Sequence, residues 1–240
     1  MFWSKAICSK TFMEKLMNKK IKLLVFLIFV GSIMCACAAK KGSTQTAESS
    51  TGTDNAIAVS SATATVSKEP AFEPFYVYED FKSNKNHYSP SGWMGDIACL
   101  KLFPDCEQEA YEGTYCIKLE YKPSDVKQWV GVYWQHPANN WGDKKGGYNL
   151  TGAKQLTFWA KGAEGKEVLS EVKIGGISGV YSDSDVAWLK GIKLSRTWKK
   201  YTINLSKSDL SSISGGFCVV LSKKDNPAGC IIYIDEIKYE

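Results

Sequence analysis

The feature that most constrains the fold is a succession of short segments, from about residue 75 onward, in which apolar and polar residues alternate between turns. Segment 115–121 reads Tyr-Cys-Ile-Lys-Leu-Glu-Tyr, so its side chains face a core and solvent in turn. Such a period of two is typical of a strand with one buried face. Segment 129–134 is mostly apolar, as in a central strand, and only 207–212 suggests a short helical turn. The sequence therefore predicts an all-β domain.

Nine strands are predicted in this region. They cover residues 75–81, 115–121, 129–134, 155–160, 167–174, 189–194, 199–205, 217–221 and 230–237. Many short strands punctuated by turns favour a β-sandwich or jelly roll. About 165 residues suffice for one such domain with its own core.

The N-terminal part has the pattern of an export signal. Residues 20–36 begin with lysines and continue into an apolar run, 23–33, which is too short for a comfortable membrane span of about 20 residues. An uncleaved anchor helix is the alternative. Met34-Cys35-Ala36-Cys37 resembles a bacterial lipobox, which implies a lipidated Cys37. Met17 offers a more ordinary start for the leader than Met1.

We expect three parts: a signal peptide over 1–36, a lipidated tether over 37–70 and a β-jelly-roll domain over 71–240. Residues 42–68 are dominated by Ser, Thr, Ala and Gly and cannot bury enough apolar surface to offset their ordering entropy. The expected location is outside the cytoplasm, at the cell surface or facing the periplasm. A single tethered domain favours a monomer.

Charge argues against one class of partner. The leader holds six lysines and one acid, which account for the whole net charge of +5. The mature chain is then nearly neutral and has no basic surplus for nucleic acid.

Five cysteines fall within the expected domain: Cys99, Cys106, Cys116, Cys218 and Cys230. They form no Cys-x-x-Cys pair, and the chain has two histidines, so a zinc cluster is poorly supported. An exported protein can form disulfides. Cys99–Cys106 is the closest pair in sequence and Cys218–Cys230 flanks a predicted hairpin, but the cysteines can equally be small buried apolar residues.

The two terminal segments of the predicted domain resemble those of a known family. Tyr78-Glu-Asp-Phe81 as an opening strand and Tyr233-Ile-Asp-Glu-Ile-Lys-Tyr239 as a closing one resemble the galactose-binding-like jelly rolls, which include many carbohydrate-binding modules. Segments 88–96 and 131–142 are similar to those of a bacterial surface group with this fold, from which no activity carries over. The resemblance covers residues 75–240.

The resemblance also implies a structural calcium where first and last strands meet. The matching carboxylates are Asp80, Glu79 and Asp235, with backbone carbonyls near 112–113 to complete a shell of oxygen ligands. The alternative is that these acids face solvent on edge strands. Lys82 stands where the family pattern carries a further acid.

Aromatic faces next to amides and acids are the surfaces that bind sugars. Segment 134–141 supplies such groups at the end of a strand, and we select Trp134, His136, Asn139, Asn140 and Trp141 as ligand-binding candidates. Trp93 and Asp96 are candidates for a second wall. The alternative is that Trp134 or Trp141 plugs one end of the sandwich while the two asparagines make a turn. We assign Trp129, Trp159 and Trp198 to the core, and segment 181–185, which Trp188 follows, to a solvated turn.

These observations favour a non-catalytic function. The chain lacks the Glu-x-Asp-x-Glu strand of jelly-roll glycosidases, the Gly-x-Ser-x-Gly elbow and the His-Glu-x-x-His helix. We expect a lipid-anchored domain that binds a polysaccharide or cell-wall glycan. The alternative is a structural or adhesion lipoprotein whose sandwich binds another protein.

Overall fold

The computed structural model describes residues 71–240, so the expected leader, Cys37 and most of the tether lie outside the described residues. Within this range the chain forms eleven strands and one short 3-10 turn, and the predicted all-β fold is confirmed. The elements are β1 (Phe75–Tyr78), β2 (Ser89–Gly95), η1 (Ile97–Cys99), β3 (Leu100–Cys106), β4 (Cys116–Tyr121), β5 (Trp129–Gln135), β6 (Gln155–Gly162), β7 (Val168–Gly175), β8 (Val186–Lys193), β9 (Lys199–Asn204), β10 (Gly215–Ser222) and β11 (Cys230–Tyr239).

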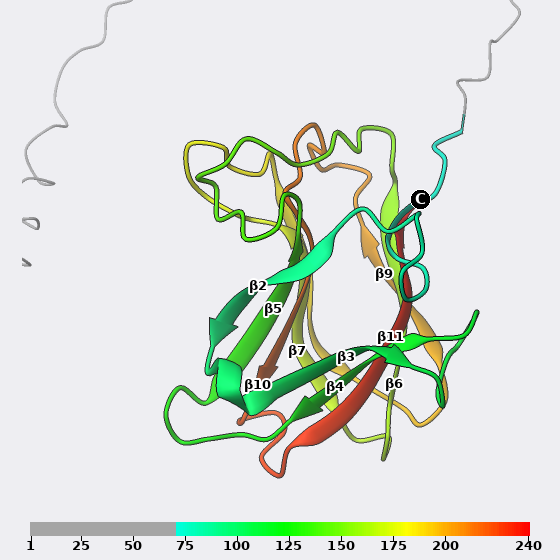
Figure 1. Ribbon diagram of the computed structural model, residues 1–240, viewed down its shortest axis with the longest axis vertical. Helices are drawn as coiled ribbons and strands as arrows, with labels where there is room; N and C mark the ends of the chain where they lie inside the picture. The colour runs from blue at the N-terminus through cyan, green and yellow to red at the C-terminus, as the bar shows by residue number, and fades with distance from the viewer. Residues whose placement is uncertain (1–70) are drawn as a thin grey trace, which may run out of the picture. The chain divides into compact units, whose positions relative to one another are not determined.

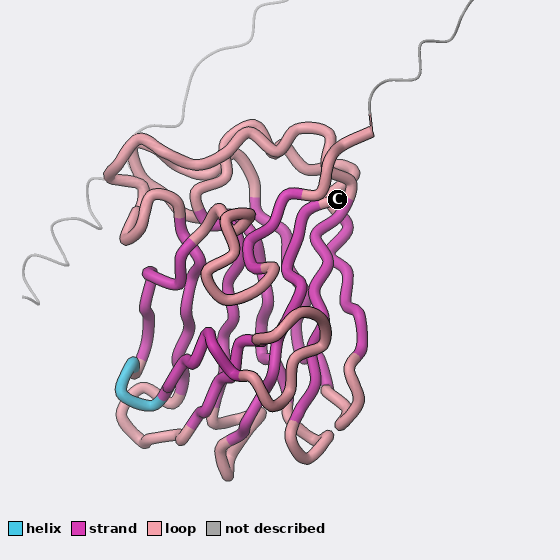
Figure 2. The backbone as a smooth tube through the Cα atoms, turned by 45° about the vertical axis from the view of Figure 1, so that its right-hand side comes forward, coloured by secondary structure: helices cyan, strands magenta, loops and turns pink. Residues whose placement is uncertain are grey.

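The strands form two antiparallel sheets that pack face to face as a jelly-roll sandwich (Figure 1). Sheet A has the order β3-β4-β11-β6-β9, and β1 adds to β11 beside it. Sheet B has the order β2-β5-β10-β7-β8. Loops gather at the two ends of the strands (Figure 2).

The core lies between the sheets and follows from the alternation along each strand. On β4, Ile117, Leu119 and Tyr121 are buried and point inward, while Lys118 and Glu120 point outward and pair with each other. Burial of such side chains stabilises the fold by about 25 cal/mol per Å² of apolar surface. This one continuous cluster holds both sheets together.

Two strands were not predicted from the sequence, and both are edges. β2 borders sheet B and β3 borders sheet A. Each contains a proline, Pro90 and Pro104, which has no N–H to donate to a ladder and is tolerated on an edge strand. These two strands were missed because proline, and Gly92 in β2, have a low strand propensity.

Within residues 71–240, no helix is long and apolar enough to span a membrane.

Candidate functional site

The outer face of sheet B carries exposed tryptophans, and β5 shows how they arise. Val130 and Val132 belong to the core, so the alternate residues Trp129 and Tyr133 point to the opposite, outer face. Trp129 is 40% exposed there. The prediction that Trp129 lies in the core is wrong.

Strand register continues this face across the sheet. Tyr133 pairs with Cys218, Cys218 with Lys173, and Lys173 with Trp188 on β8. Paired residues point to the same side, so Trp188, which is 53% exposed, shares the face with Trp129. The two tryptophans are three strands apart, about 14 Å across the sheet, and four residues apart along the strands, because Trp188 is level with Tyr133; together this is about 20 Å.

A third tryptophan borders this face from the loop after β5. Trp141 is 42% exposed and meets Tyr133 edge to face, with ring centroids 6.0 Å apart. We call Trp129, Trp141 and Trp188, with the outward residues between them, the tryptophan face.

Charged side chains lie among these rings. Glu171 is bound by Lys173 at 3.2 Å and by Lys190 at 3.1 Å. Partial burial opposes ionisation of Glu171, but the two lysines outweigh it and lower its pKa. Lys190 also lies over the Trp188 ring, and Lys173 over the Tyr133 ring. The face thus combines aromatic surfaces with hydrogen-bond donors and one acceptor.

Asn140 holds Trp141 in place. Its buried side-chain oxygen accepts hydrogen bonds from the backbone N–H groups of Gly142 at 3.0 Å and Lys144 at 3.2 Å. Its side-chain nitrogen donates to the Lys144 carbonyl and to the Ser214 hydroxyl. The asparagine therefore ties the turn that carries Trp141 and is not free to bind a ligand.

The same turn is locked to the loop after β7. Tyr181 donates its N–H to the Gly142 carbonyl at 2.9 Å, and a Cβ at Gly142 would clash with the Ser178 carbonyl oxygen. This close approach, at a φ of +87°, requires glycine. Both loops lie together at one end of the sandwich (Figure 1).

Asn139 and His136 have separate places in this loop. Asn139 is exposed, with a left-handed φ of 56°, and its N–H donates to the Ser91 hydroxyl. His136 lies against the Tyr148 ring, 4.3 Å between centroids, and its Nδ1 is 3.2 Å from the Tyr148 hydroxyl. Its imidazole is thus engaged within the protein.

Trp134 is a core residue, which corrects its selection as a ligand platform. It is 2% exposed and packs edge to face on Phe217 between the sheets. Trp134 points inward because side chains alternate along a strand: it follows the outward Tyr133 and lies on the same side as Val132.

The expected second wall does not join Trp141. Trp93 pairs with the inward-facing Val132, so its 36% exposed side chain lies on the inner side of an edge strand. Asp96 lies at the Trp129 end of β5, where its N–H donates to the Trp129 carbonyl, and its carboxylate accepts from Ser124. β5 spans about 20 Å between that end and the Trp141 loop.

The carboxylates expected to bind calcium hold a loop. The Asp80 and Asp235 carboxylates accept hydrogen bonds from backbone N–H groups, mostly of residues 111–115. The donors are Phe81, Thr114 and Tyr115 for Asp80, and Tyr111, Glu112 and Glu236 for Asp235. Glu79 pairs with Lys85 instead.

This donor set does not fit a cation as placed, because N–H groups already engage all four oxygens of Asp80 and Asp235. Within residues 71–240 no group of three or more His, Cys, Asp or Glu side chains could hold a metal ion. Calcium stays a prediction from the resemblance, and these contacts do not support it.

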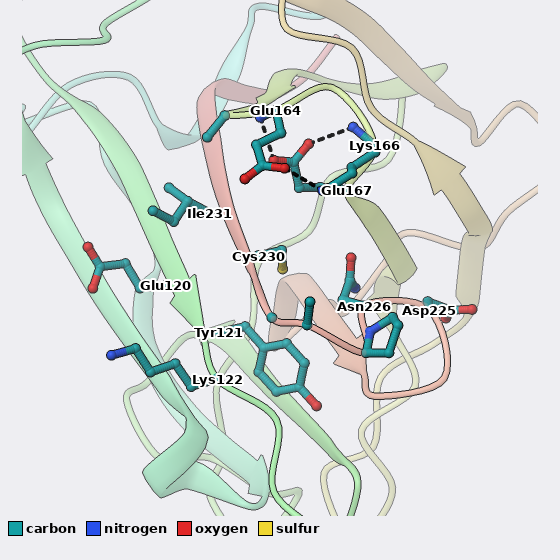
Figure 3. A pocket seen from close by; sticks show the side chains of 14 residues that line it. Glu120, Tyr121, Lys122, Glu164, Lys166, Glu167, Asp225, Asn226, Cys230 and Ile231 are labelled. Atoms are coloured by element: carbon teal, nitrogen blue, oxygen red, sulfur yellow. Dashed lines mark hydrogen bonds and ion pairs between the residues drawn. The ribbon is translucent and has the colours of Figure 1, made fainter.

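A cavity of about 680 Å³ is lined by the end of β4, the turn before β7 and the turn before β11 (Figure 3). Two of its polar side chains, Glu167 and Asn226, hold the backbone of the protein itself. The Glu167 carboxylate accepts hydrogen bonds from backbone N–H groups of the preceding turn, including that of Gly165 at 2.8 Å. The Asn226 side chain accepts from the N–H of Val168 and donates to its carbonyl. Its one aromatic lining residue, Tyr121, is 2% exposed and presents no platform. We therefore place the candidate site on the tryptophan face.

Sequence reasoning missed Trp129 and Trp188 as site residues. A signal for Trp188 exists in β8, where Val186, Trp188 and Lys190 alternate with apolar residues that pack on the core. For Trp129 no such signal exists, because β5 is apolar on both of its faces.

No protein-family model and no curated protein matches the sequence. Similar solved structures are carbohydrate-binding modules. A family 30 module has 15% identity and a TM-score of 0.49 over 70% of this chain and 98% of its own. A family 30 module of a Clostridium thermocellum cellulosomal cellulase has 16% identity and a TM-score of 0.46, over 70% and 97%. A family 29 module complexed with cellulohexaose has 11% identity and a TM-score of 0.40, over 70% and 89%. Likenesses this distant carry no argument about what this chain binds.

Proposed function

We propose that this β-jelly-roll domain binds carbohydrate on the tryptophan face, without catalysing a reaction. The observation that carries the proposal is the set of three tryptophans, each at least 40% exposed, on one face of sheet B and its bordering loop. Large exposed aromatic side chains that are not needed for the core mark a binding surface.

The chemistry of this face suits a sugar polymer. Aromatic rings stack on the C–H surfaces of sugar rings, and the adjacent groups of Glu171, Lys173 and Lys190 supply partners for hydroxyls. The spacing of Trp129 and Trp188 across three strands favours an extended chain over a single sugar unit.

Binding without catalysis is proposed from the carboxylates. Glycosidases generally use two opposed carboxyl groups. The outward residues of β5, β10, β7 and β8 include a single carboxylate, that of Glu171, and Lys173 and Lys190 are both paired with it. This face therefore does not present two opposed carboxyl groups. The lipobox-like segment that ends at Cys37 extends the proposal. The protein is then a monomeric lipoprotein outside the cytoplasm, whose tryptophan face binds a polysaccharide or cell-wall glycan.

The test is affinity electrophoresis of the chain through gels that contain one soluble polysaccharide each. We expect retardation by one class of glycan. Trp129→Ala and Trp188→Ala should each weaken that binding about tenfold, because each removes a stacking surface.

Trp93→Ala is the matched control, since Trp93 is exposed to a similar degree but lies off the face. It should bind as tightly as the unmodified chain. Retention of binding in both face variants would refute the site, and failure to bind any glycan in a broad panel would favour the protein-binding alternative.

A further inference from the structure

Two cysteines lie at the base of the loop between β3 and β4. Cys106 ends β3, Cys116 begins β4, and the two residues are direct partners in the antiparallel ladder. Opposite residues in such a pair have Cα atoms about 4.5 to 5.5 Å apart, within the range that a disulfide spans. The neighbouring Cys106 thiol also contributes to raising the pKa of the Cys116 thiol.

The structure rules out the two pairings that the sequence left open. Cys99 ends the turn η1 directly before the seven-residue strand β3, and Cys106 ends β3 itself, so the two lie about 20 Å apart, whereas a disulfide tolerates about 7 Å. Cys218 faces the outer side of sheet B beside Tyr133, away from sheet A, where Cys230 begins β11.

Cys99 and Cys230 do not pair either. Cys230 on β11 pairs with Tyr121 at the end of β4, whereas the Cys99 carbonyl, directly before β3, accepts the N–H of Lys122 on the other side of β4. The two cysteines are therefore separated by two strand spacings, about 10 Å. Cys106 and Cys116 are thus the pair within residues 71–240 that the register places within reach.

We propose that Cys106 and Cys116 form a disulfide that closes the base of the 107–115 loop. The loop is built to be held, because Asp80 and Asp235 bind its backbone and Tyr111 stacks on Trp159 with 3.9 Å between ring centroids. The bond fastens the remaining open side, where the loop joins the sheet.

A glutathione-type disulfide serves as the oxidant. Cys106, the more accessible of the two thiols, attacks it as a thiolate and forms a mixed disulfide, which releases one reduced glutathione. Cys116 then gives up its proton, attacks the Cys106 sulfur and displaces the second glutathione. Two protein thiols are oxidised and one glutathione disulfide is reduced to two thiols. Burial raises the pKa of the Cys116 thiol, which assigns it the second, intramolecular step.

Peptide mapping of the full chain tests the bond directly. The chain is equilibrated with oxidised and reduced glutathione, and free thiols are blocked with N-ethylmaleimide in denaturant. No lysine or arginine separates the two cysteines, so trypsin alone leaves both in peptide 102–118, and cleavage after glutamate at 107, 109 and 112 separates them. We expect peptides 102–107 and 113–118 to remain linked until a reductant is added, with Cys99, Cys218 and Cys230 labelled.

Cys99→Ser is the matched control and should leave this linkage intact, whereas Cys106→Ser should abolish it. Reduction should lower the Tm of the oxidised chain by roughly 5 to 10 °C and leave the Tm of Cys106→Ser unchanged. Maleimide on both Cys106 and Cys116 at every glutathione ratio, or linkage of either to another cysteine, would overturn the proposal.

Discussion

Substitution of Asn140 separates a structural asparagine from a ligand-binding one. Asn140→Ala removes four hydrogen bonds and leaves the N–H groups of Gly142 and Lys144 without their acceptor. A neutral hydrogen bond contributes about 1 kcal/mol, and these four share one side chain, so we expect a loss of about 2 to 4 kcal/mol. For a domain of this size the Tm should fall by roughly 5 to 12 °C.

Urea unfolding followed by tryptophan fluorescence measures this loss. Asn139→Gly is the control, because Asn139 is exposed and glycine keeps its left-handed backbone. That variant should change stability by less than about 0.5 kcal/mol. An unchanged midpoint for Asn140→Ala would refute the reasoning. If glycan binding also weakens in Asn140→Ala at temperatures where it remains folded, the turn positions Trp141 for the ligand.

Two further predictions concern the core and a buried carboxylate. Trp134→Ala should destabilise the fold by about 3 to 5 kcal/mol in urea unfolding, because it empties a large volume against Phe217; a loss below about 1 kcal/mol would contradict its core position. Burial raises the pKa of Asp235 to about 7. The folded state therefore retains a proton that the unfolded chain releases near pH 4. The stability from Asp235 is fully present below about pH 4, is lost progressively between pH 4 and pH 7, and changes no further above pH 7. Asp235→Asn should remove up to about 4 kcal/mol of that decline between pH 4 and pH 8, and identical pH slopes would count against the assignment.

Strand positions were largely predictable where one face of a strand meets solvent. β4 alternates Ile, Lys, Leu, Glu and Tyr, and this pattern predicts its bounds to within one residue as well as its inward side. β11 and β6 were found in the same way. β2 and β3 were not, because Pro90 and Pro104 lower strand propensity and only the sheet order reveals that both strands are edges.

The candidate site was predictable only in part, because the sequence does not show which alternate residues of β5 point into the core. β5 has apolar residues on both faces, so its sequence does not say whether Trp134 or Trp129 points inward. Pairing with β10 decides it, since Val219 and Val132 form a core pair. The selection of Trp141 agrees with its exposure, whereas the selection of Asn140 reflects the turn chemistry that the sequence offered as the alternative.

The central position of β11 has a consequence for how the sandwich assembles. This strand comes after every other strand in the chain, yet it pairs with β4, β6 and β1 and supplies Ile232, Ile234 and Ile237 to the core. Until it is synthesised, β4 and β6 have no common neighbour and expose unpaired ladder groups that can join other chains. Folding therefore waits on the last strand, and pairings this distant in sequence make it slow. A chain that emerges in sequence order therefore leaves sheet A incomplete until that strand is available.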